Sequence, residues 1–328
     1  MKALIVSDYG GPEVLGCIEL PMPCAAPGEA LVRVRASGIV RADITMRAGA
    51  YPGGAKPPYI PGSEFVGEIV QAAEGDADLT AGTRVIGLLG RPGACAEYVA
   101  VPARWLRRAP EQLSDDQAAG ALGSYLSAEV ALRLFGNLVA GRTVLINGAA
   151  GTVGIAACQL ARASGAVTIG TAGSEAKLRR LNEFGADLVI SYASPGWADE
   201  VLAATGGRGV DLAIETIGGD VLSSTIDCVA AGGRLVCVGA ASGRGSSRIR
   251  LNTLFQTNIT IGGFTLGKLW RDHQDLLSDS IERVLGSLGR DGVLPVIAAS
   301  FPIEQAAEAH RMMEEPSLVG RVILCFPR

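Results

Sequence analysis

A glycine-rich turn between an apolar run and a helix-forming segment is the part of this chain best suited to chemistry. The apolar run is Val144–Ile146, residues 147–154 read Asn-Gly-Ala-Ala-Gly-Thr-Val-Gly, and helical composition begins at Ile155. A strand, a glycine turn and a helix in this order are the context in which a dinucleotide fingerprint is credible. The N–H groups and the positive dipole end at the helix start would hold phosphates.

The two glycines of this segment have separate roles in such a fingerprint. Gly151 lacks a Cβ and could lie against a pyrophosphate, while Gly154 would let the helix pack close to the strand. The first glycine of the usual pattern is Ala149, so the motif is A-x-G-x-x-G. We expect the cofactor to contact Ala149, Gly151, Thr152 and Val153. The alternative is a purely structural strand–turn–helix unit.

The end of the next predicted strand indicates which dinucleotide is bound. NAD sites place Asp or Glu about 20 residues after the fingerprint, where the carboxylate binds the ribose 2′-hydroxyl. Ala172, 21 positions after Gly151, cannot do so. The residues that follow include Gly173, Ser174 and Lys177. A cation without a carboxylate suits a 2′-phosphate, which predicts NADPH. The alternative is that Lys177, like Arg179 and Arg180, belongs to a solvated helix face.

Composition excludes several classes of protein. The 328 residues are 48% hydrophobic and 19% charged, with a net charge of −4 and no basic run, which argues against nucleic-acid binding. No apolar run approaches the roughly 18 residues that span a bilayer, and Met1–Val6 resembles a strand start rather than a signal peptide. We therefore expect a soluble, cytoplasmic protein. The seven cysteines lack a C-x-x-C pair and are interpreted as buried thiols.

The pattern of elements predicts two lobes. Short strands broken by Pro and Gly dominate the first 115 residues, and Ser114 could cap a helix. Strands and helices then alternate, which predicts a doubly wound parallel sheet of about six strands in an α/β fold, at 143–147, 166–171, 187–190, 210–214, 234–238 and 258–264. A long helix over 272–289, a strand, a helix and a last strand over 320–326 follow. We expect this last strand to rejoin the β-rich N-terminal lobe.

Several ordered motifs resemble one family over essentially the whole length. They are Tyr9-Gly-Gly-Pro-Glu-Val-Leu15, Arg47-x-Gly-x-Tyr-Pro52, Pro61-Gly-x-Glu-x-x-Gly67, Ala149-Ala-Gly-x-Val-Gly154, Gly263-Phe-Thr-Leu266, Ala309-His310 and Gly320-Arg-Val-x-Leu324. The chain resembles the zinc-independent quinone oxidoreductases of the medium-chain dehydrogenase/reductase superfamily. The resemblance implies a GroES-like catalytic domain built from residues 1–122 and 266–328, and a Rossmann domain over 123–265. The active site would lie in the cleft between them.

The same resemblance implies the cofactor, the partners and further site residues. Lys177 and Tyr192 match the family positions that contact the 2′-phosphate of NADPH, and Ser127 stands where the family often has a threonine near the nicotinamide. Other positions along the cofactor are Gly173, Gly239, Phe264, Thr265 and Leu266. A homodimer is implied, with strand 258–264 pairing across the twofold axis.

The zinc sites of related alcohol dehydrogenases have no counterpart in this sequence. The positions of the catalytic ligands correspond to Val40, Ser63 and Ala119, none of which is a good zinc ligand. Only Cys95 lies in the region of the structural zinc lobe. The two histidines, His273 and His310, fall in predicted C-terminal helical segments. We therefore expect no metal site, and we interpret His310 as a packed or capping residue.

One departure from the family bears on the substrate. The family often has Asn-Phe where this chain has Val40-Arg41. Arg41 could supply a positive charge to an enolate oxygen, or it could point away and pair with Asp43 or Glu64. Tyr51 is the candidate to hydrogen-bond the acceptor oxygen or to supply a proton, although it could instead be an aromatic wall residue.

The expected activity is NADPH-dependent hydride transfer to a small molecule. Without a zinc ligand set, acceptors that are already activated are favoured, namely quinones, enones and 2-alkenals. One alternative is C=C reduction of an enoyl, alkenal or polyketide-type intermediate, and another is non-catalytic NADPH binding. A short-chain reductase is excluded because no tyrosine has a lysine four residues later. A P-loop is excluded because Leu269 follows Gly262-x-x-x-x-Gly-Lys268.

Overall fold

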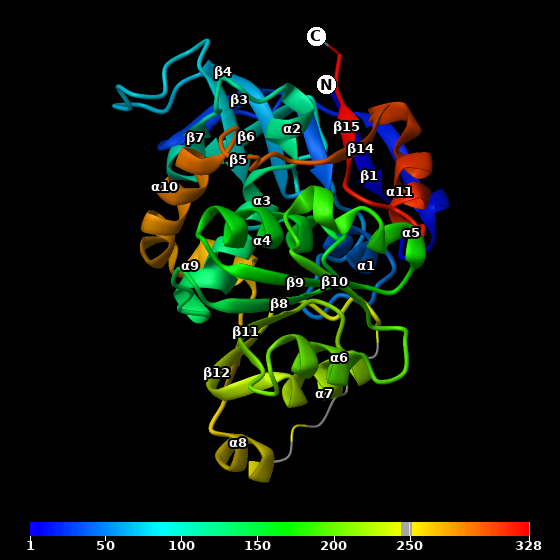
Figure 1. Cartoon of the computed structure of the whole chain (residues 1–328). Coiled ribbons are helices and arrows are strands. Elements are labelled where there is room, and N and C mark those ends of the chain that lie inside the picture. The colour runs from blue at the N-terminus through cyan, green and yellow to red at the C-terminus, as the bar shows by residue number, and fades with distance from the viewer. Residues whose placement is uncertain (244–248, 250, 328) are drawn as a thin grey trace. The chain divides into compact units, whose positions relative to one another are not determined.

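The computed structural model describes residues 1–243, 249 and 251–327, and the chain divides into two compact units (Figure 1). The terminal unit combines Met1–Gly123 with Pro295–Arg328, and the central unit is Ser124–Leu294. Each unit has a large sheet of its own. The expectation of a β-rich lobe formed from both chain ends and of a separate α/β lobe is confirmed.

The terminal unit contains an antiparallel pair and a seven-stranded sheet. The pair is β1 (Lys2–Val6) and β2 (Leu15–Glu19). The large sheet has the order β14-β15-β3-β4-β5-β7, with β6 paired to β3. Its strands are β3 (Glu29–Ile39), β4 (Glu64–Gln71), β5 (Arg84–Leu88), β6 (Tyr98–Pro102), β7 (Leu106–Arg108), β14 (Ile297–Pro302) and β15 (Arg321–Cys325). Because β15 pairs antiparallel with β3, the prediction that the last strand rejoins the first lobe is confirmed.

Helices are short in the terminal unit. The α-helices are α1 (Arg41–Arg47), α2 (Asp115–Ala119) and α11 (Ala306–Glu314), and the 3₁₀ turns are η1 (Pro12–Val14), η2 (Ala103–Trp105) and η6 (Ile303–Gln305). The expected cap of α2 is present, because the Ser114 hydroxyl accepts from the Gln117 N–H at 3.2 Å and the Gln117 side chain accepts from the Ser114 N–H at 3.0 Å.

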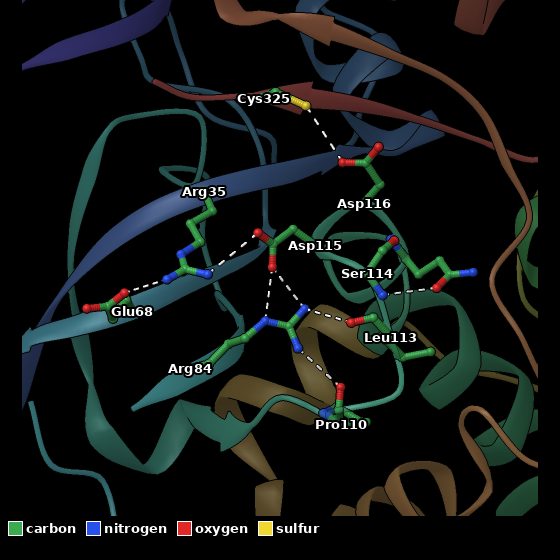
Figure 2. A network of polar contacts seen from close by, with 10 residues as sticks. Arg35, Glu68, Arg84, Pro110, Leu113, Ser114, Asp115, Asp116 and Cys325 are labelled. Carbon is green, nitrogen blue, oxygen red and sulfur yellow. Dashed lines mark hydrogen bonds and ion pairs between the residues drawn. The ribbon is translucent and has the colours of Figure 1, made fainter. Parts of the chain in front are cut away.

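A network of half-buried charges surrounds the start of α2 (Figure 2). Arg84 donates through Nε to Asp115 at 2.9 Å, and its other nitrogens donate to the carbonyls of Pro110 and Leu113. Arg35 lies between Asp115 and Glu68, at 3.7 and 2.5 Å. These contacts fasten the helix to strands β3, β4 and β5 of the sheet.

The central unit is built on the predicted six-stranded parallel sheet. The order is β10-β9-β8-β11-β12-β13, and every pairing is parallel. The strands are β8 (Thr143–Asn147), β9 (Val167–Ala172), β10 (Leu188–Ser191), β11 (Val210–Glu215), β12 (Val229–Cys237) and β13 (Thr260–Gly263). The strand order reverses between β8 and β11, and ligands of such sheets bind outside the carboxyl ends of the strands at this point.

The helices of the central unit differ from expectation in one place. They are α3 (Leu122–Glu129), the π-helical segment η3 (Val130–Phe135), α4 (Thr152–Ala163), α5 (Glu175–Leu178), η4 (Leu181–Phe184), α6 (Trp197–Ala204), α7 (Gly219–Asp227), α8 (Leu251–Thr257), α9 (Leu266–Asp272), η5 (Gln274–Leu277) and α10 (Ser278–Ser287). The single long helix predicted over 272–289 is wrong. His273 leaves the helical region, with φ −143° and ψ 44°, so the chain ends α9 there and starts again.

Residues 266–294 belong to the central unit, although a domain boundary after residue 265 was expected. Polar contacts explain this placement. The Arg283 guanidinium binds the buried Glu129 carboxylate at 2.6 Å. The Gln159 side chain both donates to and accepts from the backbone of Leu294, at 3.1 and 3.0 Å. The segment is therefore fastened to α3 and α4.

Candidate functional site

The fingerprint turn has the geometry that a phosphate-binding strand–turn–helix unit requires. Gly148 leaves β8 with φ +70°, and Gly151 is the N-cap of the twelve-residue helix α4. A Cβ on Gly154 would lie 2.2 Å from the Gly148 carbonyl oxygen, so glycine is required there for helix and turn to meet. A Cβ on Gly151 would meet only that same oxygen, at 3.2 Å. Gly151 is exposed and leaves an open surface at the helix start.

The other fingerprint residues divide between packing and exposure. Ala149 is fully buried, and a Cβ added to Gly170 of β9 would lie 3.2 Å from the Ala149 methyl group. The Ala149 side chain therefore packs on the neighbouring strand, and only its backbone could face a ligand. Thr152 and Val153 are half-buried in the first turn of α4, where backbone N–H groups have no acceptor within the helix.

The residues expected at a 2′-phosphate gather beyond the end of β9. Tyr192 lies on Gly173 so closely that a Cβ there would be 2.7 Å from the phenol oxygen. Burial, and then the charge of Glu215, raises the pKa of Tyr192, so the phenol stays protonated as a donor. The Ser174 hydroxyl is buried, and no group within residues 1–243, 249 and 251–327 hydrogen-bonds it. Lys177 is half-buried in α5.

The two neighbouring arginines are engaged elsewhere. Arg179 lies 3.4 Å from Glu175, and Arg180 lies 3.2 Å from Glu183 and over the ring of Phe184. These are exposed ion pairs on the helix surface, as expected if Arg179 and Arg180 belong to a solvated helix face.

The positions expected along the rest of the cofactor have mixed environments. Ser127 is buried in α3, and Gly239 is exposed, with the Thr216 carbonyl oxygen 3.3 Å from where its Cβ would be. The Phe264 ring stacks on Phe135 with centroids 5.0 Å apart. Thr265 is exposed at the N-cap of α9, and Leu266 begins that helix.

The two residues expected to act on the acceptor both lie on or just after α1. Arg41 is exposed at the first position of the helix. The carboxylates proposed as its alternative partners bind other groups: Asp43 accepts from the N–H groups of Val40 and Gly62, and Glu64 pairs with Arg321 at 2.8 Å. Among the ion pairs of the described residues, none includes Arg41. Tyr51 is half-buried in the turn that follows α1.

A second phenol near α1 was not predicted from the sequence. The Tyr59 hydroxyl is buried and has no hydrogen-bond partner in the described part of the chain. Burial, followed by the charge of Asp43, raises the pKa of Tyr59 to about 12, so the group would act as a hydrogen-bond donor. Its place in Pro57-Pro-Tyr-Ile-Pro61 offers no periodicity that would have marked it.

A buried polar cluster at the carboxyl ends of β8, β9 and β11 was also missed. It contains Asn147, Thr171, Glu215 and Thr225, all essentially unexposed. The signal available in the sequence was a carboxylate that directly follows the apolar run Leu212-Ala-Ile214 at the end of a strand, namely Glu215.

The described residues contain neither a metal-binding cluster nor a membrane-spanning helix. No group of three or more His, Cys, Asp or Glu side chains there is arranged to hold a metal ion. The two histidines are far from any such role, since His310 is buried against Arg47 at 3.1 Å and His273 is exposed between α9 and η5. The described helices include none that is both long and apolar enough to cross a bilayer.

Comparison with known proteins gives whole-length matches. Two family models match, the alcohol dehydrogenase GroES-like domain over residues 26–111 and the zinc-binding dehydrogenase over residues 152–283. The chain is 30% identical over 326 residues to quinone oxidoreductase of Rattus norvegicus, covering 99% of this chain and 97% of that protein. It is 31% identical over 341 residues to the synaptic vesicle membrane protein VAT-1 homolog of Homo sapiens, covering 99% and 86%. A crystal structure of quinone oxidoreductase from Thermus thermophilus, also solved in complex with NADPH, superposes with a TM-score of 0.85 at 35% identity, covering 99% and 100%.

Proposed function

This chain belongs to the zinc-independent quinone oxidoreductase family of the medium-chain dehydrogenase/reductase superfamily, and we propose that it reduces a quinone or another conjugated carbonyl compound with NADPH. The observation that carries the proposal is the cluster beyond β9. A carboxylate is missing at Ala172, and the Tyr192 phenol lies against Gly173. The next residues in the chain supply Ser174, whose buried hydroxyl no described residue binds, and Lys177. The complex of the Thermus thermophilus quinone oxidoreductase with NADPH supports the same cofactor.

The residues present fit NADPH at three points. The exposed backbone at Gly151 and the N–H groups of Thr152 and Val153 would hold the pyrophosphate. Ser174 and Lys177 would bind the 2′-phosphate, with Tyr192 donating its hydroxyl. Gly239 and residues 264–266 would line the nicotinamide half. Bound NADPH supplies the hydride, and the protein orients it.

The acceptor must be one that accepts hydride without a strong Lewis acid in the protein. Val40, Ser63 and Ala119 occupy the positions of zinc ligands in related dehydrogenases, and none of them has a side chain suited to zinc. Quinones, enones and 2-alkenals are already activated for hydride addition. Negative charge then grows on their carbonyl oxygen, and hydrogen-bond donors or cations must stabilise it.

Arg41 and Tyr51 are the proposed groups for this oxygen. Asp43 and Glu64 are bound to other donors, so neither carboxylate neutralises the Arg41 guanidinium. Arg41 is therefore available to stabilise an enolate or hydroquinone oxygen, and Tyr51 would donate a hydrogen bond or the final proton.

A second candidate function, reduction of a conjugated C=C bond, is favoured by the same departure at Val40-Arg41. Hydride addition to an enone or alkenal leaves an enolate, which is a stronger base than a hydroquinone anion and whose oxygen a guanidinium stabilises well. A simple quinone spreads its charge over a ring and depends less on such a cation. The substrate would then be an enoyl, alkenal or polyketide-type compound.

Steady-state oxidation of NADPH with matched panels of 1,4-quinones and of enones and 2-alkenals tests both functions. We expect turnover on at least one panel, with NADH a poorer donor. A preference for enones that disappears in Arg41→Gln, while quinone turnover persists, would establish C=C reduction. Failure of both panels with NADPH still bound by titration would contradict catalysis on these acceptors and favour a non-catalytic NADPH-binding role.

We also propose a homodimer through β13. This strand is last in the sheet order, so one of its edges is available for pairing in the described structure. An exposed edge strand is a template for pairing with another chain. Sedimentation velocity should give two copies per particle, and a single copy at micromolar concentration would contradict the dimer.

A further inference from the structure

A single buried carboxylate organises the carboxyl end of the central sheet. Glu215 ends β11, is 1% exposed and accepts four hydrogen bonds. One oxygen accepts from the N–H groups of Ile217 and Gly218, at 2.6 and 2.9 Å. The other accepts from the Asn147 amide at 2.8 Å and from the Thr225 hydroxyl at 3.0 Å, a hydroxyl that shares its one proton with the Val221 carbonyl oxygen at 2.6 Å. All four partners are neutral, so the carboxylate is solvated by the protein rather than paired with a cation.

Asn147 extends this network across the two neighbouring strands. It ends β8, and its side-chain oxygen accepts from the Thr171 hydroxyl of β9 at 2.7 Å. Its amide also donates to Thr225 of α7 at 2.6 Å. Its own carbonyl accepts from the Thr216 hydroxyl at 2.8 Å. The ends of β9, β8 and β11 and one helix are therefore tied through Asn147 and Glu215.

The loop that Glu215 holds, residues 216–218, connects two parts of the proposed cofactor site. On one side it touches the fingerprint turn, because a Cβ on Gly148 would lie 2.4 Å from the Thr216 hydroxyl. On the other side the carbonyls of Thr216 and Ile217 accept from the N–H groups of Ala241 and Ser242, both at 2.9 Å. The spacing between the fingerprint turn and the segment after β12 therefore depends on this loop.

The network lies at the end of the sheet where a ligand is expected to bind. It spans β8 and β11, the two strands between which the order of the sheet reverses, and ligands of doubly wound sheets bind outside this point. Burying a carboxylate without a cation costs several kcal/mol unless its hydrogen bonds are all made. A well-packed apolar cluster would stabilise the sheet without that cost, so the network suits a role in fixing geometry.

We propose that Glu215 is a positioning residue of the NADPH site, which acts through Asn147 and the 216–218 loop to fix the fingerprint turn against the segment after β12. The inference rests on the proposed function, because it assigns the network to the same cofactor. Glu215 itself touches neither NADPH nor the acceptor; it sets the backbone that does.

The variant Glu215→Gln tests this role with little change in shape. The carbonyl oxygen of the introduced amide can still accept from the two backbone N–H groups, but its NH₂ then faces the NH₂ of Asn147, which loses its carboxylate acceptor and keeps only the Thr225 hydroxyl. We expect the Kd of NADPH to rise about tenfold and its KM to rise with it, as for a lost hydrogen bond to a charged group, while the KM of the acceptor stays the same.

The second change Asn147→Asp supplies the rescue. In the double variant Glu215→Gln/Asn147→Asp the introduced amide donates to the new carboxylate, which still accepts from Thr171, so the network is complete with its polarity reversed. We expect the double variant to recover most of the lost NADPH affinity. A matched control is Val210→Ala, which creates a cavity in the buried amino end of the same strand. It should lower thermal stability and leave the Kd of NADPH unchanged.

The outcomes separate this inference from the proposed function. If the wild-type protein does not bind NADPH, the proposed function fails, and this inference fails with it. If the wild-type protein binds and Glu215→Gln binds equally well below its melting temperature, only the positioning role is overturned. Should Glu215→Gln not fold, Thr171→Val gives the same test, since it removes only the hydroxyl that orients Asn147. About a threefold loss of affinity is then expected, and no loss would overturn the inference.

Discussion

Two deeply buried carboxylates, Glu64 in the terminal unit and Glu215 in the central unit, are stabilised in different ways. In the terminal unit Glu64 and Arg321 are 1% and 2% exposed and form an ion pair at 2.8 Å. In the central unit Glu215 is equally buried, and its hydrogen bonds come from neutral donors. The ion pair joins β4 to β15, two strands from opposite ends of the chain. The neutral cluster instead joins three strand ends to a loop. The ion pair of Glu64 thus connects two strands, whereas the hydrogen bonds of Glu215 order the backbone of the 216–218 loop.

The largest effect is expected from breaking the ion pair. Arg321→Met would leave the Glu64 carboxylate buried without its cation, and would also remove donors from the carbonyls of Ile39 and Gly120. The free energy of unfolding of the terminal unit should fall by roughly 3–5 kcal/mol. Urea unfolding, with hydrogen exchange of β3 and β15 to localise the loss, measures this.

The companion variant Glu64→Gln/Arg321→Met removes the stranded charge while keeping an acceptor for the Gly123 N–H, which now binds Glu64 at 2.8 Å. Its stability should lie between those of the single variant and the wild type. A loss below about 1 kcal/mol in Arg321→Met would mean that the pair is no stronger than a surface contact, and the contrast between Glu64 and Glu215 would disappear.

The variant Lys177→Ala tests whether a cation of the central unit binds the cofactor or only stabilises the fold. Lys177→Ala should weaken NADPH binding by about 1–3 kcal/mol, as for a hydrogen bond between charged groups, and leave NADH binding nearly unchanged. Fluorescence titration with both cofactors measures this.

Arg179→Ala is the matched control, because Arg179 lies in the same segment but on the exposed surface beside Glu175. It should change neither affinity. If Lys177→Ala weakens NADPH and NADH alike, the assignment of the 2′-phosphate to Lys177 is refuted, and the cofactor preference must come from other groups.

Features set by neighbouring residues could be predicted from the sequence, and contacts between residues far apart in the chain could not. The parallel sheet, the fingerprint turn and the return of the last strand followed from local periodicity and from glycines whose role is steric, such as Gly154. The Glu215 network could not be predicted, because Asn147, Thr171 and Glu215 lie on three strands whose order in the sheet is not their order in the chain. The environment of Arg41 could not be predicted either. Whether Asp43 or Glu64 pairs with Arg41 depends on the other groups that these carboxylates bind, Gly62 and Arg321.

The pH dependence of stability should report on the buried titratable groups of the terminal unit. Burial, and then the nearby Arg47, lowers the pKa of His310 from 6.5 to about 3. The unfolded chain takes up this proton first, so stability falls as the pH falls below 6.5. Burial raises the pKa of Asp43 from 3.8 to about 6, against its backbone hydrogen bonds. The folded chain takes up that proton first, so stability is lost as the pH rises through 6.

From pH 7 to pH 5 the two effects oppose each other. His310 should cost about 2 kcal/mol and Asp43 should offset about 1 kcal/mol of it. Urea unfolding at both pH values measures the balance. In His310→Gln, where the amide oxygen can still accept from Arg47, stability should rise on acidification. In Asp43→Asn the acid loss should grow. Equal pH profiles in all three proteins would refute both assignments.

The smallest effect is expected in the half-buried network of Figure 2. Asp115 and Arg84 are each about a quarter exposed, at 26% and 25%, and the Arg84 guanidinium keeps its bonds to Pro110 and Leu113 when the carboxylate is neutralised. Asp115→Asn should therefore cost no more than about 1 kcal/mol. Because solvent ions reach this pair, the loss should shrink further in 1 M salt, where charges are screened within about 3 Å. The loss in Arg321→Met should not change with salt, because its charges are out of contact with solvent. A salt-independent loss in Asp115→Asn would place this network with the buried pair, and exposure would no longer separate the two kinds of contact.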